Sequence, residues 1–343
     1  MPGFSRRSVL AAAAAVLTGL GALAASPALA GEKIVVGALR FTSHSPSFIA
    51  FERGYFRDAG LDVEFKFFQA AQPMAVAIAS GDVDVGVTAV TAGLFSLAEK
   101  GAVKIVGGAL HEDPKIDGSA ILASMKAWEA GLKTPADIKG HSFAITQAGS
   151  SFHYMLSRVA EKEGFSLKDV RLVPLHKVGA IIGALKSGQV DSWIIVPHIA
   201  KALDGAKKAK IIGWVNRYAP DYQVTVITAS MKDLKQKPQV IRKFLTAFSK
   251  GAADFNAGLV DKTKGEEEAA KLVKLIHKYV YASKPLEKAA KSIRNGAMRI
   301  SPGARLDMAS LKNQLEWFKA QGMVRPSVSL EMLVDPAFAK AGK

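Results

Sequence analysis

The sequence contains no cysteine among its 343 residues. This absence excludes disulfide bonds, thiol nucleophiles and zinc–thiolate sites, and it also excludes a lipid-modified cysteine as a membrane anchor. Beyond the first thirty residues the sequence has no run of about 18 uncharged apolar residues, so no transmembrane helix is predicted there.

Catalytic and nucleotide-binding motifs are also missing. The sequence lacks G-x-x-x-x-G-K-[ST], G-x-G-x-x-G, H-E-x-x-H and G-x-S-x-G. Asp82, Asp84 and Asp191 stand at the starts of predicted strands, whereas open α/β sheets bind ligands beyond the opposite, carboxyl ends of their strands. We therefore expect neither an enzyme nor a cofactor or metal site.

The overall composition is that of a globular protein with a basic surface. Hydrophobic residues make up 49% and charged residues 22%, and the length allows two packed cores. Lys and Arg total 46 against 30 Asp and Glu, giving a formal net charge of +16. A positive field favours anionic partners, but the lysines are not interleaved with aromatic residues as in a nucleic-acid track. We expect a monomer that binds no nucleic acid.

The first thirty residues are typical of an export signal. Arg6 and Arg7 precede a mostly apolar stretch over 9–23, and Ala28-Leu29-Ala30 has the small-x-small pattern of a cleavage site. The arginine pair resembles a twin-arginine signal, although any two positive charges also serve a general secretory signal. We expect a signal peptide over 1–30, cleavage after Ala30 and a periplasmic protein.

An internal repeat indicates two halves of similar plan. Residues 77–84, AIASGDVD, match residues 184–191, ALKSGQVD, at an offset of 107. In each copy a helix end is followed by a glycine, Gly81 or Gly188, which can take the left-handed C-cap conformation, and then by a strand.

Strands and helices alternate in both halves, which favours an α/β fold with mainly parallel sheets flanked by helices. In the first half we predict strands over 34–39, 61–67, 83–87 and 103–107, and helices over 46–58, 73–80 and 92–100. Later helical segments should return to the first half, and 238–255 should be amphipathic. The expected domains are lobe I, 31–117 plus 229–343, and lobe II, 118–228, with hinges near 117–120 and 226–230.

The loop after the predicted strand 142–146 is the most informative candidate site. Gly149 permits close backbone approach, and Ser150 or Ser151 begins a helix whose free N–H groups suit an anion or another polar acceptor. A plain N-capping serine explains the same residues equally well. In the equivalent loop of the first half, Arg40 is suited to a carboxylate or sulfonate, or to a surface salt bridge.

Several segments resemble the nitrate/sulfonate/taurine-binding protein family, which also includes pyrimidine-precursor binders related to the thiamine-pyrimidine synthase. They are 45–56, SPSFIAFERGYF, with 60–63, GLDV, and later the GSS of 149–151 and the LKSGQVD of 185–191. The resemblance extends from about residue 34 to residue 255. It implies a two-lobed type II periplasmic-binding-protein fold, a small-molecule ligand in the cleft between the lobes, and an ABC-importer permease as partner.

The resemblance, with the loop positions above, also implies a set of ligand contacts. These are Arg40, Phe41, Ser43, His44, Gln72, Thr88, Ala89, Gly149, Ser150, Ser151, Phe152, His153, Lys177, Trp193, Pro197 and His198. Family members often carry Glu-Pro where this chain has Val196-Pro197, and the missing carboxylate favours a ligand without a cation. The synthase branch uses a cysteine-rich motif, which a chain without cysteine cannot supply.

The leading hypothesis is a periplasmic protein that captures a small organic anion, a sulfonate or carboxylate, by closure of its two lobes about the hinge. Within the same class, the alternative is a neutral heteroaromatic ligand such as a pyrimidine, stacked on Phe41 or Trp193. An exported enzyme on the same fold and a sensory or adhesion module are the alternatives from other classes.

Overall fold

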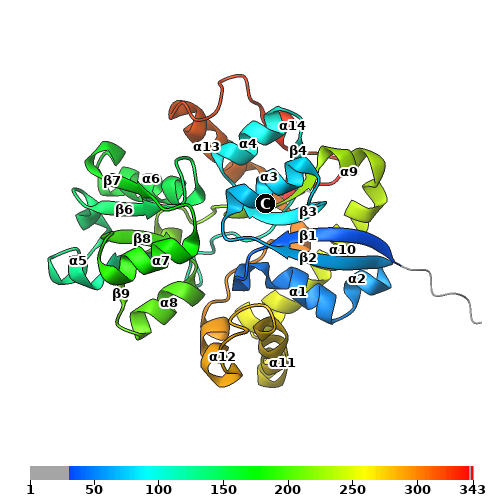
Figure 1. Cartoon of the computed structure of the whole chain (residues 1–343), viewed down its shortest axis with the longest axis horizontal. Coiled ribbons are helices and arrows are strands. Elements are labelled where there is room, and N and C mark those ends of the chain that lie inside the picture. Colours follow the sequence, from blue (N-terminus) through cyan, green and yellow to red (C-terminus); the bar gives the residue numbers. More distant parts are fainter. Residues whose placement is uncertain (1–30, 340, 343) are drawn as a thin grey trace, which may run out of the picture. The chain divides into compact units, whose positions relative to one another are not determined.

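The computed structural model describes residues 31–339 and 341–342. The predicted signal segment lies outside the described residues, so cleavage after Ala30 and the export route stay predictions. Two five-stranded sheets organise the described chain (Figure 1). The first sheet has the order β2-β1-β3-β10-β4, from β1 (Glu32–Ala38), β2 (Leu61–Phe67), β3 (Val85–Ala89), β4 (Val103–Gly108) and β10 (Thr225–Ser230). The second has the order β7-β6-β8-β5-β9, from β5 (Ala120–Ser124), β6 (Ser142–Ile145), β7 (Arg171–Pro174), β8 (Ser192–Ile195) and β9 (Ala209–Trp214).

The two sheets share one plan, as the sequence repeat predicted. In both, the first two strands of the unit pair in parallel, and the third lies on the other side of the first. The same carboxylate bond recurs at the start of the third strand. Asp84 accepts the backbone N–H of Val35 at 2.7 Å, and Asp191 accepts that of Ser142 at 2.8 Å. These aspartates therefore join neighbouring strands at the end of the sheet opposite the carboxyl ends.

Helices cover the sheets, and most begin and end where the local sequence predicts. They are α1 (Ser45–Glu52), α2 (Tyr55–Asp58), α3 (Ala71–Ser80), α4 (Ala92–Glu99), α5 (Met125–Glu129), α6 (Ser151–Glu163), α7 (Val178–Ser187) and α8 (Pro197–Gly205). Gly81 and Gly188 end α3 and α7 with φ of 82° and 71°, which confirms the predicted left-handed C-caps. The single helix predicted over 46–58 is wrong, because Gly54 has a φ of 75° and separates α1 from α2.

Strand β5 was not predicted: the hinge was placed at 117–120, and the first strand of lobe II at 142–146. Ala120–Ser124 is wholly buried and runs antiparallel between β8 and β9. β10 occupies the equivalent antiparallel place between β3 and β4. The chain therefore passes from one sheet to the other between β4 and β5 and again between β9 and β10. The lobe and hinge boundaries themselves stay a prediction.

The remaining helices belong to the C-terminal third of the chain. They are α9 (Met231–Gln236), α10 (Pro238–Phe255), α11 (Gly265–His277), α12 (Leu286–Asn295), α13 (Met308–Ala320) and α14 (Leu330–Leu333). The predicted apolar side of 238–255 is confirmed, since Phe244 and Phe248 are fully buried and Phe244 stacks on Phe56 with ring centroids 5.4 Å apart. Within the described part of the chain, no helix is long and apolar enough to cross a membrane.

Candidate ligand-binding site

A cavity lies at the carboxyl ends of strands from both sheets. Leu39 and Ala89 line it after β1 and at the end of β3, and Thr146 and Ile195 line it after β6 and at the end of β8. This is the end of a parallel sheet at which α/β proteins bind their ligands. The free space is about 70 Å³. It is smaller than the ~150 Å³ apolar cavity that accepts benzene in another protein, so it favours a compact ligand.

The starts of several helices converge on this cavity. Its lining includes Ala70 and Ala71 at the start of α3, Thr91 before α4, Ser150 before α6 and Val196 before α8. The first N–H groups of a helix have no partner within the helix, and the helix dipole adds a positive potential there. The caps of α3 and α6 supply no side-chain bond to these groups. Backbone N–H groups at the starts of α3 and α6 are therefore available as hydrogen-bond donors beside the cavity.

Two serine hydroxyls in the lining lack a hydrogen bond. The Oγ atoms of Ser119 and Ser150 are buried without a partner among the described residues, and Ser150 is 2% exposed. Buried polar atoms in native proteins nearly always have a partner, and a polar ligand group in the cavity that Ser119 and Ser150 line would supply one. The predicted N-capping role of Ser150 is wrong in one respect, because its side chain makes no capping bond.

His44 lines the cavity as a neutral donor. Its Nδ1 accepts the backbone N–H of Leu39 at 3.3 Å, which leaves the ring proton on Nε2. Burial lowers the pKa of His44 to about 3, so the ring carries no charge at neutral pH. Gln72 accepts the hydroxyl of Thr91 at 3.1 Å through Oε1, and this fixes its amide nitrogen as a further donor.

Charged side chains are absent from the lining that the described residues form. Apolar side chains supply most of the wall: Leu39, Phe41, Leu110, Phe152, Met155, Val178, Ile195, Val196 and Val224. A ligand held here would meet donors at the helix starts and an apolar surface around the rest of its body.

The structure brings half of the predicted contacts together. The lining contains Phe41, Ser43, His44, Gln72, Ala89, Ser150, Ser151 and Phe152. They come from the equivalent loops after β1 and β6, from the end of β3 and from the start of α3.

The two predicted cationic contacts do not line the cavity. Arg40 is exposed, its guanidinium lies 3.7 Å from the ring centre of Phe67, and its Nη1 donates to the carbonyl of Tyr279 at 3.2 Å. Lys177 is exposed at the N-cap of α7. Any ligand contact by either residue stays a prediction, and this structure places neither side chain for one.

Three further candidates are buried beside the cavity and not in its lining. The hydroxyl of Thr88 donates to the carbonyl of Ala71 at 3.2 Å. Trp193 lies inside β8, fully buried, with Phe152 edge-on at a centroid distance of 5.6 Å. Pro197 is the first residue of α8, next to the lining residue Val196.

The remaining candidates lie at contacts between the two halves. The carbonyl of Gly149 accepts the N–H of Ala92 at 3.0 Å, while its own N–H donates to Nδ1 of His153 at 3.3 Å. His198 Nδ1 lies 3.0 Å from the hydroxyl of Thr42, which also donates to the carbonyl of Gly296 at 3.1 Å. These bonds hold the halves against each other around the cavity.

Sequence reasoning missed the lining residues on the segments that connect the sheets. Leu110, Ser119, Val224 and Thr225 belong to these segments. They stand outside the repeat, and no local motif marks them, because only the pairing of distant strands brings them to the cavity.

Comparison with known proteins agrees with this architecture. The putative aliphatic sulfonates-binding protein of Escherichia coli K12 is 34% identical over 137 residues, which cover 40% of this chain and 40% of that protein. The match thus spans about two-fifths of the length of this curated relative.

Solved structures show the same fold. The alkanesulfonate-binding protein SsuA from Xanthomonas axonopodis pv. citri, bound to MOPS, superposes with a TM-score of 0.70 and 21% identity, covering 88% of this chain and 98% of that one. The periplasmic nitrate-binding protein NrtA from Synechocystis PCC 6803 gives 0.66 and 14%, covering 88% and 84%. The predicted α/β periplasmic-binding-protein fold is confirmed. The model of the NMT1/THI5-like family matches residues 41–257, so the chain belongs to that family.

Proposed function

We propose that the chain is the periplasmic solute-binding component of an ABC importer, and that it holds a small organic anion of the sulfonate or carboxylate type in the cavity between its two halves. The proposal rests on the unpartnered hydroxyls of Ser119 and Ser150, which are lining residues of a cavity at which several helices begin. The family, the sulfonate-binding and nitrate-binding relatives, and their place in the periplasm support it.

An anion suits the cavity although no Lys or Arg lines it. Backbone N–H groups at helix starts, two hydroxyls and the Nε2–H of His44 all donate, and helix dipoles favour negative charge at this end. No carboxylate in the described lining would balance a cationic ligand. Phe41, Phe152 and Met155 would surround the ligand's apolar body.

Ligand entry requires the two halves to separate, because bonds between them close the cavity. The N–H of Ala92 donates to Gly149, and the N–H of Val178 donates to Gln69 at 3.3 Å. We propose that the two lobes rotate about the two segments that join the sheets. One lies between β4 and β5 and includes 117–120, and the other lies between β9 and β10, next to 226–230. A monomer that closes on its ligand would present one surface of both lobes to a permease.

A neutral heteroaromatic ring is the second candidate. It is favoured by the uncharged lining and by the rings of Phe41 and Phe152. The free volume of about 70 Å³ does not separate it from a short sulfonate of similar size, so the hydrogen-bond donors near the helix starts favour the anion.

Thermal-shift and calorimetry measurements on a ligand panel distinguish an anionic ligand from a neutral heteroaromatic one. Short alkanesulfonates, short carboxylates and pyrimidines are added to the mature protein in a buffer that is not a sulfonic acid, because a sulfonic-acid buffer could occupy the site. We expect a short anion to raise the melting temperature through mass action, and to be recovered chemically unchanged after incubation. Tight binding of a pyrimidine with no response to any anion would refute the anion assignment.

Two variants test whether the anion binds in this cavity. Ser150→Ala should weaken anion binding, whereas Arg40→Ala should not, because Arg40 is exposed and contacts Phe67 outside the lining. The opposite pattern would place the anion elsewhere.

A further inference from the structure

A buried carboxyl group lies on the segment between β4 and β5, next to the cavity. Glu112 is 1% exposed, and its two carboxylate oxygens accept the backbone N–H of Ser119 at 3.0 and 3.2 Å. The N–H of Glu112 donates to the carbonyl of Tyr222, on the other connecting segment, at 2.9 Å. The group therefore sits where the two segments that join the sheets meet.

Ser119 links this carboxyl group to the ligand site. Its carbonyl accepts the N–H of Val215 at 2.8 Å, so its backbone is held on both sides. Ser119 belongs to the cavity lining, and its buried hydroxyl has no hydrogen-bond partner among the described residues. Gly118 allows this arrangement, since a side chain at that position would overlap the carboxylate of Glu112.

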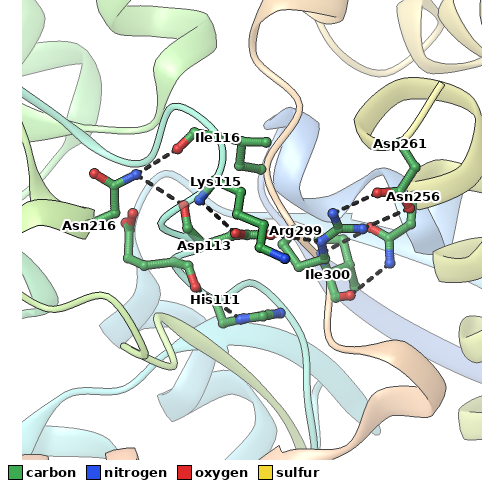
Figure 2. Close-up of polar contacts among 10 residues, drawn as sticks. His111, Asp113, Lys115, Ile116, Asn216, Asn256, Asp261, Arg299 and Ile300 are labelled. Atoms are coloured by element: carbon green, nitrogen blue, oxygen red, sulfur yellow. Dashed lines mark hydrogen bonds and ion pairs between the residues drawn. The ribbon is translucent and has the colours of Figure 1, made fainter.

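The groups around Glu112 leave its charge uncompensated. On its own segment, Asp113 pairs with Arg299 at 3.2 Å, and Arg299 also pairs with Asp261 at 2.7 Å (Figure 2). That arginine is therefore already shared by two carboxylates. Burial lowers the pKa of His111, so the neighbouring ring is not a cation at neutral pH.

The other neighbours are neutral or paired. Tyr222 faces Glu112 from the second connecting segment with Tyr154 of α6 behind it, and burial raises the pKa of Tyr222 far above its usual range. Asp117 pairs with Lys201 at 2.7 Å. Burial raises the pKa of Glu112 to about 7, and the bonds from the backbone N–H of Ser119 offset this only in part.

We propose that Ser119 contacts the polar head of the ligand, and that Glu112, as the positioning residue behind it, makes binding of an anion depend on its own protonation. The proposal rests on the proposed function, because it assigns a regulation to the same cavity.

The direction of the pH dependence follows from the charge of Glu112. An ionised Glu112 repels an anion placed against Ser119, and a protonated Glu112 does not. Binding of an anion should therefore favour uptake of a proton by Glu112, and affinity should fall as pH rises above about 7. Since one group exchanges one proton, the fall cannot exceed about tenfold per pH unit.

Calorimetry with ethanesulfonate between pH 5.5 and 8.5 tests this, because the sulfonate itself stays ionised over the whole range. For the wild type we expect affinity to fall above neutral pH. We also expect uptake of at most about half a proton per ligand at pH 7, since Glu112 is already half protonated there, and of more at higher pH, measured in two non-sulfonate buffers of different ionisation enthalpy. Ser119→Ala should weaken binding about tenfold.

Glu112→Gln should bind with an affinity that is flat in pH. Asp84→Asn is the matched control, because Asp84 also accepts a backbone N–H but lies at the far end of the first sheet, so the pH profile should survive. If Glu112→Gln does not fold, proton uptake by the wild type decides the question.

These measurements distinguish failure of the role proposed for Glu112 from failure of the proposed function. Binding of ethanesulfonate with no pH dependence and no proton uptake would overturn the role of Glu112 and leave the proposed function intact. If Glu112→Gln kept the wild-type pH dependence of affinity, the role of Glu112 would likewise be overturned and the proposed function left intact. No binding of any sulfonate or carboxylate at any pH would overturn both.

Discussion

The substitution Gly296→Ala should introduce a steric clash between the two halves. Gly296 follows α12 and lies against His198, in the first turn of α8. A Cβ atom at 296 would lie 2.1 Å from the Cβ atom of His198, 2.6 Å from its Cα atom and 2.8 Å from its backbone nitrogen. Carbon atoms pack about 3.5–4.0 Å apart, so the segments would have to separate by about 1.5 Å. The helix backbone fixes all three obstructing atoms, so rotation of the His198 side chain cannot relieve the clash.

The free-energy cost of this clash should destabilise the closed form, in which the two halves are in contact. Gly296 has a φ of −105°, which alanine adopts without strain. Overpacking of this kind typically costs about 1–3 kcal/mol. The ligand-free protein can avoid the clash by separating its halves, whereas the ligand-bound protein cannot. We therefore expect Gly296→Ala to lower ligand affinity by about 5- to 150-fold.

Calorimetry measures this affinity, small-angle scattering reports whether saturating ligand still compacts the variant, and thermal unfolding reports the ligand-free stability. Gly205→Ala is the control, because Gly205 ends the same helix and a Cβ there would meet nothing within 4 Å. We expect that control to bind normally. Wild-type affinity in Gly296→Ala would refute the reasoning. So would an equal loss of ligand-free stability, because the contact would then belong to the open form as well.

Three further predictions concern single side chains. Ser150→Ala should lower the affinity for an anion about tenfold or more in calorimetry, since a hydrogen bond to a charged group contributes about 1.5–3 kcal/mol, and thermal unfolding should stay unchanged because the hydroxyl has no partner to lose. The raised pKa of Glu112, about 7 against an ordinary 4.5, means that the folded protein keeps a proton that the unfolded chain releases. The free energy of unfolding should therefore fall by about 3 kcal/mol as pH rises across this window, and urea titrations should show no such fall for Glu112→Gln. Burial opposes the ionisation of Asp191, but bonds from the hydroxyl and amide of Ser142 lower its pKa, so its contribution is present at neutral pH and lost in acid. Asp191→Asn should be less stable than the wild type at pH 7 and equal to it in acid urea titrations, and a gap that persists in acid would contradict this.

Local sequence patterns were enough to predict the repeated units. Glycines at helix ends, alternating strands and helices, and the offset of 107 between matching segments depend on contacts within about thirty residues. The left-handed conformations of Gly81 and Gly188 and the start of α6 at Ser151 followed directly. The carboxyl ends of the strands could therefore be predicted as the site before the cavity was known.

Side-chain direction within those loops depended on partners far along the chain. Arg40 was predicted beside the ligand, yet its guanidinium meets Phe67 and the carbonyl of Tyr279, 239 residues away in sequence. Trp193 was predicted to line the pocket, but packing inside β8 buries it completely.

The sequence by itself determined two similar α/β halves and the loops after β1 and β6 that line the cavity, because these follow from helix caps and strand periodicity over short distances. Only the tertiary structure decided that β5 would pair between β8 and β9, and that Ser119 and Glu112 would lie next to the cavity. Those positions depend on strand pairing across distant parts of the chain, which no local pattern encodes.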